Sequence, residues 1–134
     1  MLEILPAPAH VGAYRFEGTL TAADYDRCIA DVEARLAAHA RIGLYCDLRA
    51  FTGITPAALV RDLRYGLGKV GQFDRFARGA IVTGRPWLAR VTRIAGRMFP
   101  RSDIRSFEAD AATAAMAWVS AVDPGAAPAP GPRR

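Results

Sequence analysis

The residues best suited to do chemistry in this chain are one carboxylate, two arginines and three threonines that lie at or just after two short apolar runs. They are Asp47, Arg49, Thr52, Thr55, Thr83 and Arg85. Asp47 has the residue type of a catalytic or phospho-accepting carboxylate, but an aspartate there also suits hydrogen bonds to the backbone of the following loop. Free backbone amides and the helix dipole at the start of a helix favour a bound anion, which nearby hydroxyl and guanidinium groups can help to hold. The set therefore predicts a ligand- or anion-binding site.

No arrangement in the sequence predicts a catalytic centre, a cofactor or a metal ion. His10 and His39 lie apart from any serine or cysteine pattern that would make a nucleophile and base. The glycines do not form a phosphate-binding motif. Cys28 and Cys46 lack the spacing of metal ligands and instead resemble small buried residues of a reducing compartment. The sequence therefore favours a non-enzymatic protein.

Alternating apolar patterns predict the elements that would position these residues. They predict an α/β chain in the order β-β-α-β-α-β-α-β-α, with helices connecting the later strands of one sheet. The expected strands are Met1–Leu5, Val11–Glu17, Ile42–Cys46, Gly79–Thr83 and Ile104–Phe107, and the expected helices are Thr21–Ala40, Thr55–Val70, Arg85–Arg101 and Asp110–Val122. Ligands of such sheets favour the carboxyl ends of the strands. All six candidate residues fall at those ends.

Two helix starts and one strand are predicted in more detail. Thr21 with Asp24 forms a capping pattern, and Thr55 before Pro56 supplies a capping hydroxyl and a ring suited to the first helical position. The strand Ile42–Cys46 is apolar throughout, which predicts a central place in the sheet. Residues 48–54 are expected to form a loop, and the second helix is expected to bury Leu59 and Val60 among others.

Positive charge is concentrated in the second half of the chain. The net charge is +5, and residues 61–105 hold eleven basic residues against three acidic ones. The predicted helix Arg85–Arg101 is amphipathic, with apolar residues on one face and a basic face on another formed by Arg90, Arg93, Arg97 and Arg101. This face is either a solvated surface or a contact for an anionic partner, such as a peripheral membrane surface. Nucleic acid is disfavoured because the aromatic residues share the apolar face.

Composition predicts one domain over residues 1–122 and a disordered tail rich in proline and glycine over residues 123–134. No apolar run approaches the length of a membrane span, which favours a cytoplasmic protein, peripheral at a membrane at most. A homodimer through the second or third helix is a further option with no specific signal behind it.

Taken together, the ordered segments resemble the SpoIIAA-like family, related to the STAS domain of sulfate transporters and anti-sigma-factor antagonists. The resemblance covers Met1 to about Val122 and is carried by these segments in order: LEILP, GAYRFEGTLTAADYD, LYCDLRAFTGITPAALVRDLRYGL, FDRFARGAIVTGRPWLARVTRIAGRMFP and SDIRSFEADAATAAMAWV. It implies a STAS-like α/β fold, with a mixed sheet and helices mainly on one side. It also implies a non-enzymatic binding or regulatory role, with a lipophilic ligand or membrane association.

The resemblance also implies an alternative role as a phospho-regulated protein-interaction module. Anti-sigma-factor antagonists carry Asp-Ser-Ser-Gly after the central strand, where this sequence has Thr52, Gly53, Ile54 and Thr55. Thr55 is the hydroxyl closest to the phosphorylated position and is the candidate phosphorylation site. Because both serines and the preceding aspartate are missing, control by a kinase is in doubt.

Overall fold

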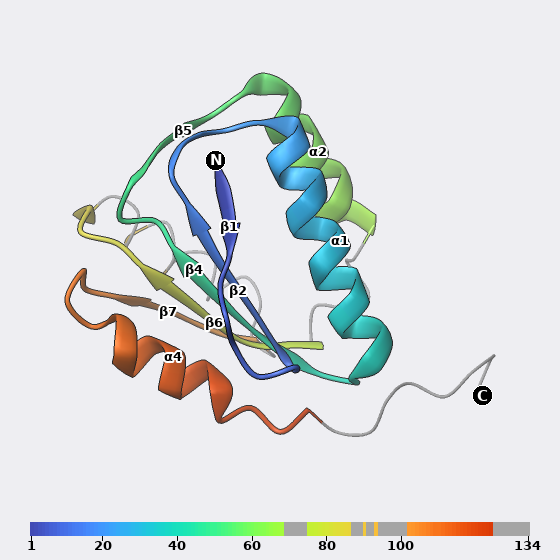
Figure 1. Cartoon of the computed structure of the whole chain (residues 1–134), viewed down its shortest axis with the longest axis vertical. Coiled ribbons are helices and arrows are strands. Elements are labelled where there is room, and N and C mark those ends of the chain that lie inside the picture. The colour runs from blue at the N-terminus through green and yellow to red at the C-terminus, as the bar shows by residue number, and fades with distance from the viewer. Residues whose placement is uncertain (69–74, 87–89, 91–92, 94–101, 125–134) are drawn as a thin grey trace.

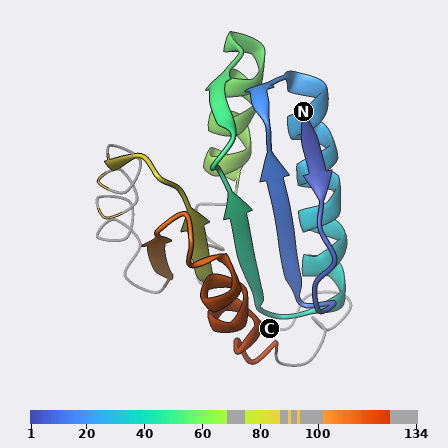
Figure 2. The same ribbon diagram turned by 60° about the vertical axis from the view of Figure 1, so that its left-hand side comes forward.

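A five-stranded mixed sheet forms the centre of the molecule, with helices on both of its faces (Figures 1 and 2). The computed structural model describes residues 1–68, 75–86, 90, 93 and 102–124. Its elements are β1 (Leu2–Ile4), β2 (Val11–Phe16), β3 (Gly18–Leu20), α1 (Ala22–Ala38), β4 (Ile42–Asp47), β5 (Phe51–Ile54), α2 (Pro56–Gly68), β6 (Phe76–Val82), β7 (Asp103–Phe107) and α4 (Ala112–Ser120).

The predicted central strand is confirmed. The strand order is β1-β2-β4-β6-β7, so β4 lies in the middle of the sheet. The strands β2, β4, β6 and β7 are parallel, and β1 runs antiparallel to β2 at one edge. Both faces of β4 are covered, which explains why its sequence is apolar throughout rather than alternating.

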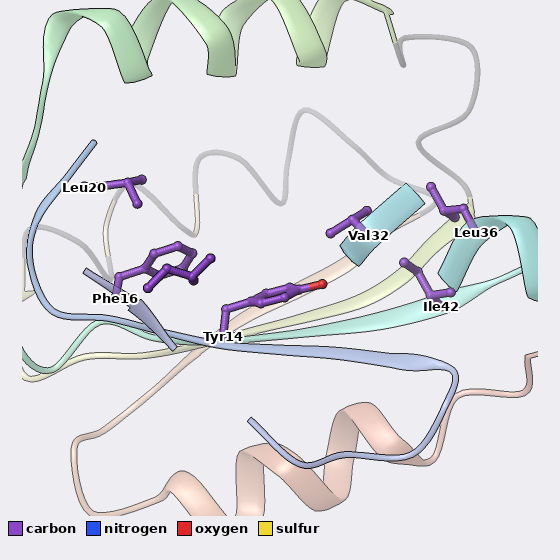
Figure 3. Packing of buried hydrophobic residues seen from close by; sticks show 7 residues of the cluster. Tyr14, Phe16, Leu20, Val32, Leu36 and Ile42 are labelled. Carbon is purple, nitrogen blue, oxygen red and sulfur yellow. The ribbon is translucent and has the colours of Figure 1, made fainter. Parts of the chain in front are cut away.

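Each face of the sheet has its own core. On the α1 side, Tyr14, Phe16 and Ile42 pack with Val32 and Leu36 of the helix (Figure 3). A second core on the opposite face is covered by α4 and consists of Val11, Ala13, Tyr45, Ala80, Val82, Ala115 and Val119. The helix α2 lies beside α1, so two of the described helices share one face and α4 takes the other (Figure 1).

Both predicted helix starts are confirmed. Thr21 caps α1 through a capping box, in which its Oγ1 accepts from the Asp24 backbone N at 3.2 Å and Asp24 Oδ2 accepts from the Thr21 backbone N at 3.1 Å. Thr55 Oγ1 accepts from the Ala58 backbone N at 3.2 Å, and Pro56 is the first residue of α2. The side-chain oxygens thus satisfy backbone donors that have no partner within the helix.

The predicted loop over residues 48–54 is wrong in its second half. Residues 51–54 form β5, which pairs in parallel with β3 as a separate two-stranded sheet. The chain turns into β3 at Gly18, whose φ of 64° suits a residue without a side chain. Both strands contain glycine and threonine and lack a run of alternating apolar residues, so the sequence pattern did not reveal them.

The predicted burial of Leu59 and Val60 is also wrong, since these side chains are 46% and 47% exposed. The helix α2 packs beside α1 rather than flat on the sheet, and Ala58 is its fully buried residue near the N-terminus. Among the described side chains of α2, the packed face therefore includes Ala58 but not Leu59 or Val60. Of the predicted helix Arg85–Arg101, Pro86, Arg90 and Arg93 are helical, and most of the remainder lies outside the described residues.

Candidate functional site

The structure places Asp47 at the carboxyl end of β4 as predicted, but as one partner of a buried ion pair. Its side chain is 3% exposed. Arg49 donates to it three times, from the backbone N at 3.1 Å, from Nε at 2.9 Å and from Nη2 at 2.7 Å, and Arg15 Nε lies at 3.4 Å. These hydrogen bonds, chiefly those of the Arg49 side chain, hold the pKa of Asp47 below its usual range. Asp47 therefore has the structural role considered above, because its carboxylate accepts from the backbone of the loop that follows β4.

The other predicted residues at this edge also find local partners. Thr83 is buried, and its Oγ1 accepts from the Arg85 backbone N at 3.1 Å. Thr55 caps α2, and Arg49 Nη1 donates to the Ala109 carbonyl at 3.0 Å. Thr52 is exposed on β5. Asp47 and Thr83 lie at the ends of the neighbouring strands β4 and β6, whereas Thr52 lies on β5 of the separate small sheet and Thr55 at the start of α2. The polar atoms of Asp47, Thr55 and Thr83 are committed to the protein itself.

Only half of the predicted basic face can be placed. Arg90 and Arg93 are exposed, as the prediction requires, whereas Arg97 and Arg101 lie outside the described residues.

A cavity of about 380 Å³ lies between the sheet and the helices α1 and α2. Its floor crosses β2, β4, β6 and β7, and the floor side chains include Phe16, Leu44, Cys46, Ile81 and Ile104. Tyr25, Cys28, Ile29 and Val32 of α1 form one wall, together with Asp62 and Tyr65 of α2. The lining is mostly apolar, and its volume lies within the range of about 300–1,000 Å³ typical of small-molecule sites.

Three tyrosines line this cavity, and the hydroxyl of each donates to a carboxylate. Tyr14 reaches Asp31 at 2.6 Å, Tyr25 reaches Asp62 at 2.5 Å, and Tyr65 reaches Glu33 at 2.9 Å. The last two bonds join α1 to α2. Burial, reinforced by these carboxylates, raises the pKa of all three tyrosines, so the hydroxyls stay protonated and act as donors.

Both cysteines line the cavity as free thiols. Cys28 projects from α1 and Cys46 from β4, and burial raises the pKa of each to about 12. Protonated thiols are weak nucleophiles and weak metal ligands. Among the residues that the structure describes, no cluster of three histidine, cysteine or carboxylate side chains could hold a metal ion.

Sequence reasoning missed this cavity because it directed attention to the strand ends. The apolar run of β4 predicts a strand covered on both faces, and Cys28 and Cys46 are predicted to be buried, so neither pattern signals a cavity. One available signal was the small residue Gly79 in the middle of β6, which leaves space on the floor of the cavity. The other was Asp62, a carboxylate within the apolar pattern of α2.

The mixed sheet with its antiparallel edge strand, and the placement of α1 and α2 together on one face, define a STAS-like α/β domain. A profile of the SpoIIAA-like family matches residues 11–120, and the chain belongs to that family. A similar solved structure is that of an uncharacterised protein with a SpoIIAA-like fold from Shewanella loihica PV-4. It has a TM-score of 0.69 and 24% sequence identity, and the match covers 89% of this chain and 92% of that one. A search of curated proteins found no match. No helix among the described residues is long and apolar enough to cross a membrane.

Proposed function

We propose that this protein is a non-enzymatic binding protein that holds a lipophilic small molecule in the cavity between the sheet and α1 and α2. The observation that supports the proposal is the cavity itself, an apolar space of about 380 Å³ lined by strands of the five-stranded sheet and by α1 and α2. An apolar ligand would gain by removing its surface and that of the lining from water. The raised pKa values of Cys28 and Cys46 argue against a reactive thiol in the cavity.

Gly79 offers a direct test because a side chain at this position would enter the cavity. A Cβ atom there would lie 3.8 Å from Ile104 Cγ1, an ordinary contact, so the backbone can accept a larger residue. We expect wild type to bind the fluorescent probe N-phenyl-1-naphthylamine saturably and Gly79→Phe to bind it at least about tenfold more weakly. Gly79→Ala, which fills little of the space, should remain close to wild type.

The cysteines provide a second readout of the same experiment. If the probe occupies the cavity, it should slow the reaction of Cys28 and Cys46 with a thiol reagent in wild type but not in Gly79→Phe. Circular dichroism and the urea midpoint would establish that the variant is folded. Unchanged probe affinity in a folded Gly79→Phe protein would place binding elsewhere and refute the proposal.

Association with an anionic membrane surface is a second candidate, supported by the exposure of Arg90 and Arg93. We expect sedimentation with phosphatidylglycerol vesicles but not with phosphatidylcholine vesicles, weakening as salt is added. Arg90→Glu/Arg93→Glu should reduce the bound fraction severalfold. Arg41→Glu/Arg64→Glu makes the same charge change at two other exposed arginines and serves as the control. Equal loss in both double variants would show a general charge effect and no dedicated face.

A phospho-regulated docking role has weaker support. Thr52 is exposed on β5, and the exposed apolar side chains of Ile54 on the same strand and of Leu59 and Val60 on the following helix are suited to a protein contact. The Thr55 hydroxyl, in contrast, is bound to the Ala58 backbone N as a helix cap, so a phosphate on Thr55 would displace that cap. Thr52 is therefore the more accessible of the two hydroxyls.

A further inference from the structure

Polar groups in the cavity wall are concentrated where α1 meets α2. Asp62 lines the cavity from α2, and its Oδ1 accepts the hydroxyl hydrogen of Tyr25 at 2.5 Å. Asp62 is exposed to solvent, so it lies at the mouth of the cavity rather than in its depth. A ligand with its tail inside would bring its polar end to this position.

Asp62 differs from the other aspartates of the two helices. Asp31 has Arg35 Nε at 2.7 Å, Asp26 pairs with Arg61, and Asp24 lies 3.4 Å from the amino terminus. Among the residues that the structure describes, Asp62 has no cationic partner. Its one hydrogen bond within that part of the chain comes from the neutral hydroxyl of Tyr25. It is also the only aspartate or glutamate among the described lining residues.

Arg78 carries the positive charge among the described lining residues, and its guanidinium group points away from the cavity. Arg78 belongs to β6, and its Nη1 donates to the Trp118 carbonyl at 2.7 Å. Its guanidinium carbon lies 4.9 Å from the centre of the Trp118 ring, which belongs to α4 on the opposite face of the sheet. This guanidinium is therefore not available to a ligand head at the mouth beside α2.

We propose that the ligand of this cavity is an amphiphile with a cationic, hydrogen-bond-donating end, such as a primary ammonium group, which binds Asp62 while its apolar tail fills the space between the sheet and the helices. The inference rests on the proposed function and replaces the anionic ligand that the sequence suggested. An ammonium group donates to a carboxylate through charge-assisted hydrogen bonds, which are stronger than neutral ones. A ligand carboxylate would instead meet Asp62 as a like charge.

The test compares three ligands with the same tail and different heads. Decylamine, decanol and decanoic acid would each be titrated against bound N-phenyl-1-naphthylamine at neutral pH, below the concentrations at which they form micelles. We expect decylamine to displace the probe best and decanoic acid worst, with about a tenfold difference in affinity between them. The difference is limited by the exposure of Asp62 to water.

Three variants distinguish the charge of Asp62 from its other effects. Asp62→Asn should remove the preference for the amine and leave the decanol affinity unchanged, which also shows that the cavity is intact. Tyr25→Phe removes the hydroxyl and keeps the carboxylate, so the preference should persist. Asp26→Asn removes a carboxylate of α1 that does not line the cavity, and the wild-type order should remain.

The proposed function and the inference about the polar end of the ligand fail on different results. If none of the three compounds displaces the probe and the probe itself does not bind, the proposed function fails. If all three bind with equal affinity, or the acid binds best, the cavity binds lipophilic molecules but the inference about its polar end is overturned. The same holds if Asp62→Asn keeps the full preference for the amine.

Discussion

Replacing Asp47 by alanine should lower the free energy of unfolding by about 2–3 kcal/mol. The change removes a buried acceptor and leaves the backbone N of Arg49, which donates to Asp47 at 3.1 Å, without that partner. The arginines themselves are 37% and 39% exposed, so they can turn to water, which keeps the cost at the lower end for a broken ion pair. Urea denaturation at neutral pH measures the difference.

The chain contains a matched control for this change. Asp103 and Arg105 have the same spacing as Asp47 and Arg49 and form an ion pair at 3.1 Å, but both side chains are about half exposed. Asp103→Ala should therefore cost less than about 1 kcal/mol. Similar losses for the two variants would show that burial of the Asp47 pair does not decide its contribution.

The same pair predicts how the effect depends on pH. The pKa of Asp47 is lowered in the folded state, so its stabilisation is present above the pKa of the unfolded chain, near pH 4, and is lost as pH falls through the lower folded value. The difference between wild type and Asp47→Ala should therefore shrink in acid. A difference that grows on acidification would mean that the carboxylate is not stabilised by Arg49.

Gly43→Ala is expected to be about as damaging, by about 2–3 kcal/mol, for a purely steric reason. A Cβ atom on Gly43 would lie 2.7 Å from the Val119 carbonyl oxygen and 3.3 Å from Val119 Cβ. The carbonyl belongs to the backbone of α4, so relief requires the whole helix to move away from β4. Urea midpoints of wild type and variant measure the loss.

Gly53→Ala is the control for the Gly43 variant. Gly53 also lies in a strand, but a Cβ atom there would meet nothing within 4 Å. The alanine should be neutral or slightly stabilising because it restricts the unfolded chain. If Gly43→Ala proved equally harmless, α4 would not be held against β4 as closely as the structure indicates.

Local signals in the sequence predicted much of this fold correctly. The caps at Thr21 and Thr55 were predictable because each depends on a hydroxyl and a backbone donor within three residues. The central place of β4 was predictable because a strand covered on both faces needs apolar residues throughout. In contrast, the exposure of Leu59 and Val60 depends on how α2 lies against α1, which no pattern within α2 records.

The candidate site was harder to predict for a related physical reason. The prediction that Asp47 and Thr83 lie at the carboxyl ends of strands followed from the apolar runs that precede them. Whether their polar atoms face a ligand depends on Arg49 and on the Arg85 backbone, and only the structure shows those contacts. A cavity is the space left between elements, so residues such as Gly79 reveal it only after the sheet and helices are in place.

The position of α4 at the end of the described fold has a consequence for synthesis on the ribosome. The core on that face of the sheet includes Val11, Ala13 and Tyr45 from the first half of the chain, and Ala115 and Val119 cover it. While the chain grows, the apolar residues of β2 and β4 have no cover on that side until α4 has left the exit tunnel. The apolar side chains of β2 and β4 on that face are therefore exposed to other proteins for most of translation, which favours aggregation.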